Sequence, residues 1–213
     1  MSGLQQSNSS SHTILVPCCG KTVDMIYLCQ LGHNVVATEL VEKPILEFIN
    51  ENKFKFTKST FNSTTTLYDI VVPKSTSDDS SSPTPGSLRI YHGDLFQLTT
   101  KVLGYQVDGV LDRGALVAMD DDMVEAYAIC IVGLLKTGGK YLLLSTHYDG
   151  TNKKDNGPPH SFDKTRLNNL YVKKLNCTLK ELDDRKIQVQ KDSELYKRGL
   201  RVVFRNPCLI TKQ

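Results

Sequence analysis

The sequence predicts one α/β domain with a mostly parallel sheet and helices on both faces of that sheet. Short β-branched runs alternate with longer segments whose apolar residues recur at helical spacing, which is typical of consecutive strand–helix units. Residues 14–16 and 141–144 are continuously apolar, as strands buried on both faces should be. A length of 213 residues suits a single domain with a full-sized core.

Five short apolar runs are expected to form the parallel strands. Short β-branched and apolar runs of this kind are typical of strands. The expected strands are residues 13–17, 34–39, 88–92, 107–112 and 140–146.

Three longer segments between these strands are expected to be helices. Residues 22–31 place apolar side chains on one face and are followed by Gly32, a common helix terminator. Residues 43–50 carry a proline in the first turn, where a missing N–H costs nothing. Residues 120–135 begin with acidic residues suited to a helix N-terminus and are closed by Gly138-Gly139.

The remaining segments break this alternation. Residues 73–87 are polar and of low complexity, so we expect a mobile surface loop. Residues 162–172 are expected to be a helix. After it, residues 177–190 and 200–211 are expected to form an antiparallel hairpin, which completes a seven-stranded sheet.

Composition excludes several classes of protein. The formal charge of +3 is mild and the basic residues are scattered, so we expect no nucleic-acid partner. No apolar stretch approaches the length of a membrane span, and residues 1–12 form a polar tail without the features of a secretory signal. We expect that tail to be disordered, and the protein to be cytoplasmic and monomeric. The six cysteines lack zinc-knuckle spacing, so reduced thiols and no metal site are expected.

Candidate ligand-binding residues follow the first two expected strands. In an open parallel sheet, ligands bind outside the carboxyl ends of the strands. Gly20 lets the backbone pass close to a ligand, although a plain turn explains a single glycine equally well. Glu39 ends the second strand about 20 residues after the first turn, where an acid accepts the hydroxyls of a ribose. The alternative is a surface glutamate that caps the next helix.

Two further candidates follow the third and fourth strands. Asp94 can accept a hydrogen bond from an adenine amino group while Leu95 lines the ring, or it can be an ordinary turn aspartate. Asp112 and Arg113 lie between an apolar strand and Gly114-Ala115, where a ligand-binding role competes with a structural ion pair.

Four motifs together carry a resemblance to a known family. They are Pro17-Cys18-Cys19-Gly20-Lys21 with Asp24-Met25, Gly32-His33-Asn34-Val35-Val36 with Glu39, Asp112-Arg113-Gly114-Ala115-Leu116, and Gly157-Pro158-Pro159. In this order and spacing, from about residue 14 to the C-terminus, the chain resembles the thiopurine S-methyltransferases. The resemblance implies the Rossmann-like fold of class I methyltransferases. It also implies S-adenosyl-L-methionine as methyl donor and an aromatic or heterocyclic thiol, or a related chalcogen compound, as small-molecule acceptor.

The resemblance also implies roles for individual residues. Glu39 would hold the ribose hydroxyls, and Arg113 would lie near the reacting centre with Asp112 as its catalytic neighbour. The expected cofactor contacts are Cys18, Gly20, Glu39, Asp94, Leu95 and Arg113. Because heteroaromatic thiols ionise readily, no strong general base is needed. His147 and His160 are spare candidates for that role.

Two departures from the family pattern favour an alternative to an active methyltransferase. Family members carry helical segments before the first strand that close over both ligands, whereas twelve residues precede Thr13 here. An arginine before the last strand is replaced by Glu194, with Lys197 and Arg198 nearby. The alternative is a truncated or non-catalytic cofactor-binding protein, and the short N-terminus leads us to expect cofactor binding with weak thiol methylation. A nicotinamide dehydrogenase is disfavoured by the single-glycine turn.

Overall fold

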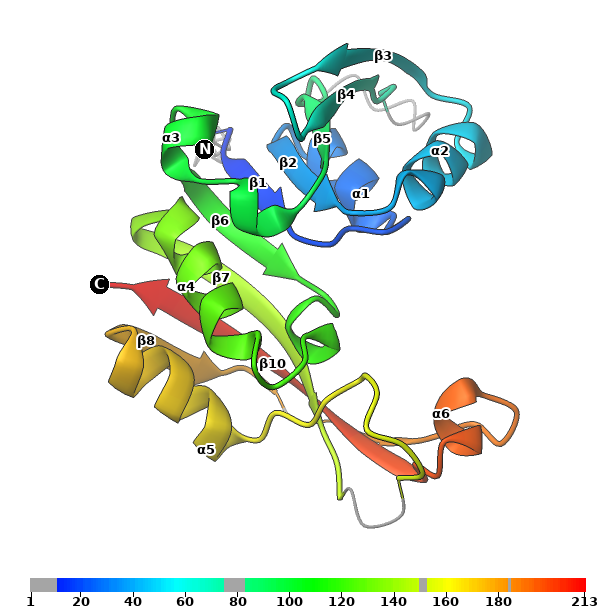
Figure 1. The fold of residues 1–213 in the computed structure, drawn as a ribbon, viewed down its shortest axis with the longest axis vertical. Helices are drawn as coiled ribbons and strands as arrows, with labels where there is room; N and C mark the ends of the chain where they lie inside the picture. The colour runs from blue at the N-terminus through cyan, green and yellow to red at the C-terminus, as the bar shows by residue number, and fades with distance from the viewer. Residues whose placement is uncertain (1–10, 75–82, 150–152, 184) are drawn as a thin grey trace, which may run out of the picture.

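The structure is a computed structural model that describes residues 11–74, 83–149, 153–183 and 185–213. Within these ranges the chain forms a twisted ten-stranded sheet with helices on both faces (Figure 1). The strand order is β3-β4-β5-β2-β1-β6-β7-β10-β8, and β9 pairs with β10. The central five strands, β5-β2-β1-β6-β7, are parallel, and antiparallel strands extend the sheet at both sides.

The parallel strands confirm the predicted core. They are β1 (Thr13–Val16), β2 (Asn34–Glu39), β5 (Leu88–His92), β6 (Val107–Asp112) and β7 (Leu135–His147). The last of these begins earlier than predicted, because the preceding helix leads into it without a loop. The expected helix-closing pair Gly138-Gly139 therefore lies inside a strand, and this detail of the prediction was wrong.

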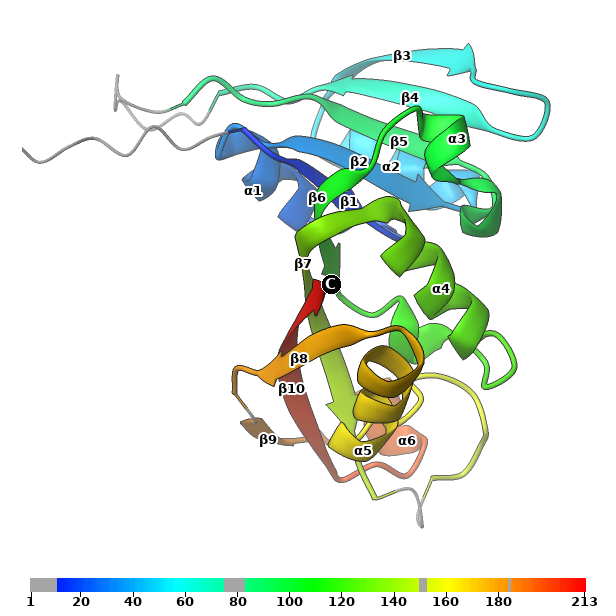
Figure 2. The same cartoon turned by 90° about the vertical axis from the view of Figure 1, so that its left-hand side faces the viewer.

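Helices cover the two faces in separate groups (Figure 2). The helices α1 (Asp24–Gln30) and α2 (Glu42–Glu51) pack on one face and enclose one apolar core. The other face carries α3 (Thr100–Leu103), α4 (Val124–Leu134) and α5 (Lys164–Leu167), which continues as the π-helix η4 (Asn168–Lys174). None of the helices in the described ranges is long and apolar enough to cross a bilayer.

Two strands of the sheet were not predicted. β3 (Lys55–Thr60) and β4 (Thr66–Val71) form an antiparallel pair that joins the sheet through β5. Every residue of β3 is exposed, because it is an edge strand, so its sequence lacks a buried apolar pattern. Burial of Tyr68 and Ile70 in β4 anchors the pair to the core.

The C-terminal strands also differ from the predicted hairpin. β8 (Cys177–Glu181) and β9 (Arg185–Gln188) are separate strands, and both pair with the long strand β10 (Val202–Lys212). The helix α6 (Glu194–Lys197) lies between β9 and β10. Together with β3 and β4, this division gives ten strands instead of the predicted seven.

Two predicted loops fall partly outside the described residues. Of the N-terminal tail, residues 1–10 lie outside; the Ser11 hydroxyl donates a hydrogen bond to the Gly32 carbonyl at 2.8 Å. Of the low-complexity segment, residues 75–82 lie outside, and its final residues pack on the domain. The Gly86 N–H bonds to the Cys29 carbonyl at 2.9 Å, and a Cβ at this glycine would collide with the backbone of His33.

Candidate functional site

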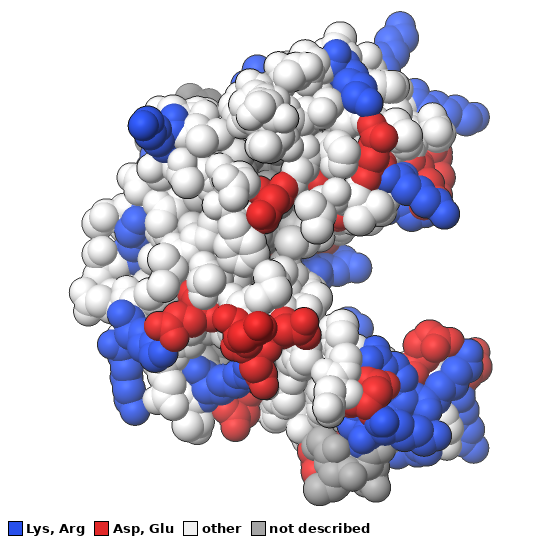
Figure 3. All heavy atoms as spheres, in the orientation of Figure 1, with Lys and Arg blue, Asp and Glu red and all other residues white. Residues whose placement is uncertain are grey.

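The predicted ligand-binding residues meet at one edge of the sheet. The chain runs from β1 to β2 and β5 on one side and then returns to β6 on the other, so the strand order reverses beside β1. In such sheets the crevice at the carboxyl ends next to the reversal is where ligands bind. This edge faces the hollowed side of the molecule, between the parts that carry α2 and α6 (Figure 3).

The turn after β1 is bonded directly to the end of β2. The Gly20 N–H donates to Oε2 of Glu39 at 2.9 Å, and the Val41 N–H donates to Oε1 at 2.9 Å. Cys18 and Gly20 both have positive φ angles, 46° and 51°. No atom lies within 4 Å of the position of a Cβ at Gly20, so the turn is open on this side. The Glu39 carboxylate is thus fixed in place and keeps lone pairs for further donors.

The Cys18 thiol at this turn is held in its neutral form. Loss of solvation, together with the carboxylates of Asp112 and Glu39, raises the pKa of Cys18 to about 12. At neutral pH the sulfur is therefore a thiol and a poor nucleophile, although its residue is exposed.

The turn after β5 presents an acid and an apolar residue. Asp94 is exposed, and its Oδ1 accepts a hydrogen bond from the Phe96 N–H at 2.9 Å, which caps the short helix η1 (Leu95–Gln97). Leu95 itself is only 6% exposed and packs in the core on the α4 face. Asp94 therefore offers its second carboxylate oxygen at the site, whereas little of the Leu95 side chain is accessible.

Asp112, at the end of β6, is completely buried. Its carboxylate accepts hydrogen bonds from the hydroxyls of Tyr127 and Tyr141, each at 2.7 Å, and from the N–H groups of Ala115 and Leu116. Burial raises the pKa of Asp112, although these donors act in the opposite direction. The two tyrosines come from α4 and β7 and were not identified from the sequence. The arrangement holds the turn after β6 and keeps Asp112 away from the open crevice.

Arg113, the next residue, points outward and is 59% exposed in its side chain. Its Nη1 lies 3.1 Å from Oδ2 of Asp24, at the start of α1. The Thr22 hydroxyl donates to the same carboxylate at 2.7 Å. An arginine at the strand edge is thereby oriented by an acid from a neighbouring element. The sequence motif contained Asp24, but sequence reasoning assigned it no role.

Comparison with known proteins shows the family to which this chain belongs. The family model for thiopurine S-methyltransferase (TPMT) matches residues 3–213. A thiopurine S-methyltransferase of Bordetella petrii is 32% identical over 187 residues, which are 88% of this chain and 75% of that protein. That of Rattus norvegicus is 33% identical over 171 residues, 80% of this chain and 65% of the relative. The chain belongs to the thiopurine S-methyltransferase family.

Other relatives and solved structures complete the comparison. A thiopurine S-methyltransferase of Legionella pneumophila is 32% identical over 72% of this chain. This chain spans about three fifths, 61%, of the length of that relative. The structure of a Burkholderia thailandensis N1-methyltransferase with bound S-adenosylhomocysteine has a TM-score of 0.56 at 18% identity, covering 95% of this chain and 72% of that one. TehB of Haemophilus influenzae has a TM-score of 0.60 at 14% identity, covering 96% and 58%. The fold is that of class I methyltransferases.

The C-terminal residues that depart from the family pattern lie together in the structure. Arg198 donates from Nε to Oδ2 of Asp155 at 2.8 Å and also bonds to the carbonyl of Pro158. It therefore braces the loop that contains Gly157-Pro158-Pro159. Glu194 and Lys197 pair with each other on the exposed helix α6.

The two histidines named as spare bases have other neighbours. His147 stacks on Phe204, with ring centroids 4.7 Å apart. Nε2 of His160 lies 3.4 Å from Oδ1 of Asp120. Neither contact involves the turns after β1 or β2.

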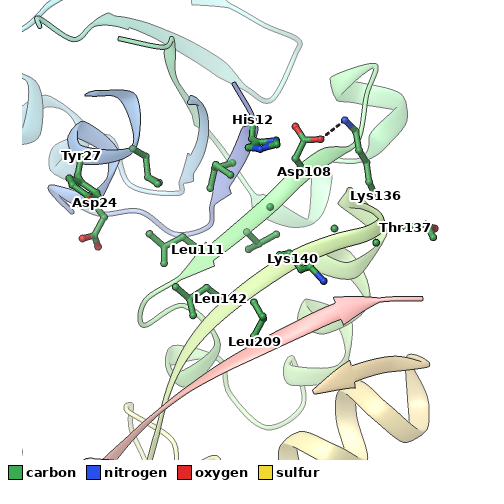
Figure 4. A pocket seen from close by; sticks show the side chains of 16 residues that line it. His12, Asp24, Tyr27, Asp108, Leu111, Lys136, Thr137, Lys140, Leu142 and Leu209 are labelled. Atoms are coloured by element: carbon green, nitrogen blue, oxygen red, sulfur yellow. Dashed lines mark hydrogen bonds and ion pairs between the residues drawn. The ribbon is translucent and has the colours of Figure 1, made fainter. Parts of the chain in front are cut away.

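A larger cavity than those at the strand ends lies on a different part of the sheet. It has a volume of about 730 Å³ and extends over the face of β6, β7 and β10 on the α1 side (Figure 4). Leu111, Leu142 and Leu209 form its floor, and Lys136 pairs with Asp108 at its rim. None of the predicted cofactor residues lines it.

Proposed function

We propose that this chain is an S-adenosyl-L-methionine-dependent methyltransferase that methylates a soft nucleophile, an aromatic or heterocyclic thiol or a related chalcogen compound. Membership of the thiopurine S-methyltransferase family supports this activity. The relatives named above carry that enzyme name, and a structural neighbour holds S-adenosylhomocysteine. The chain spans only part of the length of its relatives. The proposed activity therefore rests also on the residues at the strand ends of this chain.

The residues at the strand ends fit the proposed cofactor. The open turn at Gly20 gives a ligand access to the backbone, and the fixed Glu39 carboxylate can accept the hydrogen bonds of two ribose hydroxyls. Asp94 has a free carboxylate oxygen for an adenine amino group. Cys18 and Leu95 would contribute the turn backbone and a small apolar surface.

When bound, the cofactor supplies an electrophilic methyl group on a positively charged sulfur. The residues of this chain then have to align the acceptor and keep it ionised. Arg113, exposed at the same edge, can attract an anionic thiolate and lower its pKa by its charge. Because the Cys18 thiol stays protonated, it does not compete as a nucleophile.

Asp112 has a different role from the one expected from sequence. We assign it as a positioning residue, since its buried carboxylate holds the turn that carries Arg113 and touches no open surface. Asp24 acts similarly by orienting the guanidinium of Arg113. The observation that carries the proposed function is the bond between Gly20 and Glu39, which joins the two turns that we propose to bind the cofactor.

Calorimetry with S-adenosylhomocysteine, followed by methylation assays with thiophenol, tests the proposal. We expect binding and turnover, and we expect Arg113→Gln to reduce turnover more than cofactor affinity. Arg89→Gln is the matched control, because Arg89 forms a similarly exposed ion pair with Asp69 across the ladder between β4 and β5. Binding without turnover of aryl thiols would support the non-catalytic alternative, which the family match does not favour. Absence of cofactor binding in a folded protein would overturn the proposal.

A further inference from the structure

A cavity beside Arg113 is lined by arginines from different parts of the chain. It has a volume of about 490 Å³ and lies between the turn after β6, the carboxyl half of β7, β9 and the first half of β10. Arg113, Arg185 and Arg205 line it, and Leu144 and Pro207 contribute apolar side chains. Arg113 thus belongs both to the edge where the cofactor site lies and to this cavity.

Arg185 and Arg205 are direct partners across two antiparallel strands. They are register partners in the ladder between β9 and β10 (Figure 2), and both line the same cavity. Like charges directly opposite each other in a sheet are destabilising. An anion bound between the two guanidinium groups would remove this repulsion, because each presents several donors to a planar oxyanion.

Among the residues that the structure describes, nearby carboxylates compensate only part of the positive charge of the three arginines. Asp183 accepts a hydrogen bond from Nε of Arg185, and Asp24 pairs with Arg113. Arg205 is exposed, and its guanidinium bonds to no group within the described ranges. The cavity therefore combines an excess of positive charge with an arginine whose donors remain available.

The residues that line the cavity indicate the kind of ligand. Its apolar wall, which includes Leu144 and Pro207, suits the face of a ring, and its arginines suit an anionic substituent on that ring. We propose that Arg185 and Arg205 form an anion subsite that selects methyl acceptors whose ring carries a carboxylate. The inference rests on the proposed function and specifies its substrate class.

A pair of acceptors that differ only in the carboxylate tests this subsite. The probes are meta-mercaptobenzoate and thiophenol, assayed with wild type, Arg185→Gln, Arg205→Gln and Lys186→Gln. Lys186 is the matched control, since it follows Arg185 in β9 and its partner is Phe204, on the opposite face of the ladder. We expect Arg205→Gln to lower the kcat/KM ratio of meta-mercaptobenzoate to thiophenol at least about tenfold, the low end of what loss of a charge-assisted hydrogen bond costs.

The kinetic pattern separates a binding role from a structural one. A contact made equally in the ground state and the transition state changes KM and not kcat. The lower kcat/KM of Arg205→Gln should therefore come from a higher KM for meta-mercaptobenzoate. The preference should also weaken as salt is raised, because the site is exposed. An unchanged ratio in both arginine variants, or a fall of the same size in Lys186→Gln, would overturn the subsite.

A binding measurement distinguishes failure of the subsite from failure of the proposed function. If wild type binds S-adenosylhomocysteine but methylates neither thiol, calorimetry with meta-mercaptobenzoate still decides the question. Binding that is lost in Arg205→Gln supports the subsite, and equal binding in both proteins contradicts it. A loss of S-adenosylhomocysteine affinity in Arg205→Gln would mean that the arginine serves the cofactor instead, which also refutes the assignment.

Discussion

Replacing Asp112 with asparagine tests how the turn that carries Arg113 is held. Four donors converge on this buried carboxylate, and two of them are tyrosine hydroxyls that are themselves completely buried. In the variant, the remaining oxygen can face either the backbone N–H groups or the hydroxyls, so the amide nitrogen must face the other pair. Two of the four donors then lose their acceptor.

The stability lost in Asp112→Asn depends on how the hydroxyls of Tyr127 and Tyr141 rearrange. If the amide nitrogen faces them, Tyr141 can turn its proton toward the hydroxyl of Tyr171, 3.2 Å away, and accept a bond itself. Tyr127 has Asp112 as its hydrogen-bond partner among the described residues, so its proton is left unsatisfied. The variant loses a charge-assisted hydrogen bond and gains a buried unsatisfied donor, but it no longer buries a charge. Together these changes should lower the free energy of unfolding by about 2–4 kcal/mol. This is a large fraction of a typical stability of about 5–15 kcal/mol.

Urea unfolding followed by circular dichroism measures this effect in Asp112→Asn, Tyr127→Phe and the double variant. Tyr127→Phe alone should cost about 1.5–3 kcal/mol, because it removes one bond to a carboxylate. The double variant should cost less than the sum, since the orphaned hydroxyl is then absent. An unchanged urea midpoint in Asp112→Asn, or strictly additive costs, would refute the reasoning.

Three further predictions concern other parts of the chain. Glu39→Ala should weaken S-adenosylmethionine binding by about 1.5–3 kcal/mol in a folded protein, with a smaller loss in Glu39→Gln, which keeps one acceptor oxygen; unchanged calorimetric affinity would contradict this role. Replacing the polar residues 75–82 with a short Gly-Ser link should leave Tm within about three degrees, because their composition cannot offset the entropy of ordering, whereas a large drop would show that they pack on the domain. The Arg198 guanidinium lowers the pKa of Asp155 from 3.8 to about 2, so this pair stabilises the fold above pH 3.8, and its contribution is lost as the pH falls through about 2. The stability difference between wild type and Arg198→Gln should therefore shrink on acidification, and a difference that is equal at high and low pH would argue against the pair.

The parallel core and the edge that carries the candidate site could be predicted from the sequence because their signals are local. The apolar runs 14–16 in β1 and 141–144 in β7, and the periodic Ile45, Phe48 and Ile49 of α2, reflect burial of each element on its own. Once the strands are parallel, their carboxyl ends share an edge, so the turns at Gly20 and Glu39 had to meet.

Contacts between distant residues were decided only by the tertiary structure. Asp112 looked like an exposed site residue beside Arg113, but tyrosines 15 and 29 positions later in the chain close over it. The edge strand β3 escaped prediction because an exposed strand has no apolar pattern. The facing pair Arg185 and Arg205 depends on the register of β9 with β10, which is set by pairing across an intervening helix. Sequence periodicity reports which side of an element is buried, whereas register and partner choice arise from packing between elements that the local pattern does not contain.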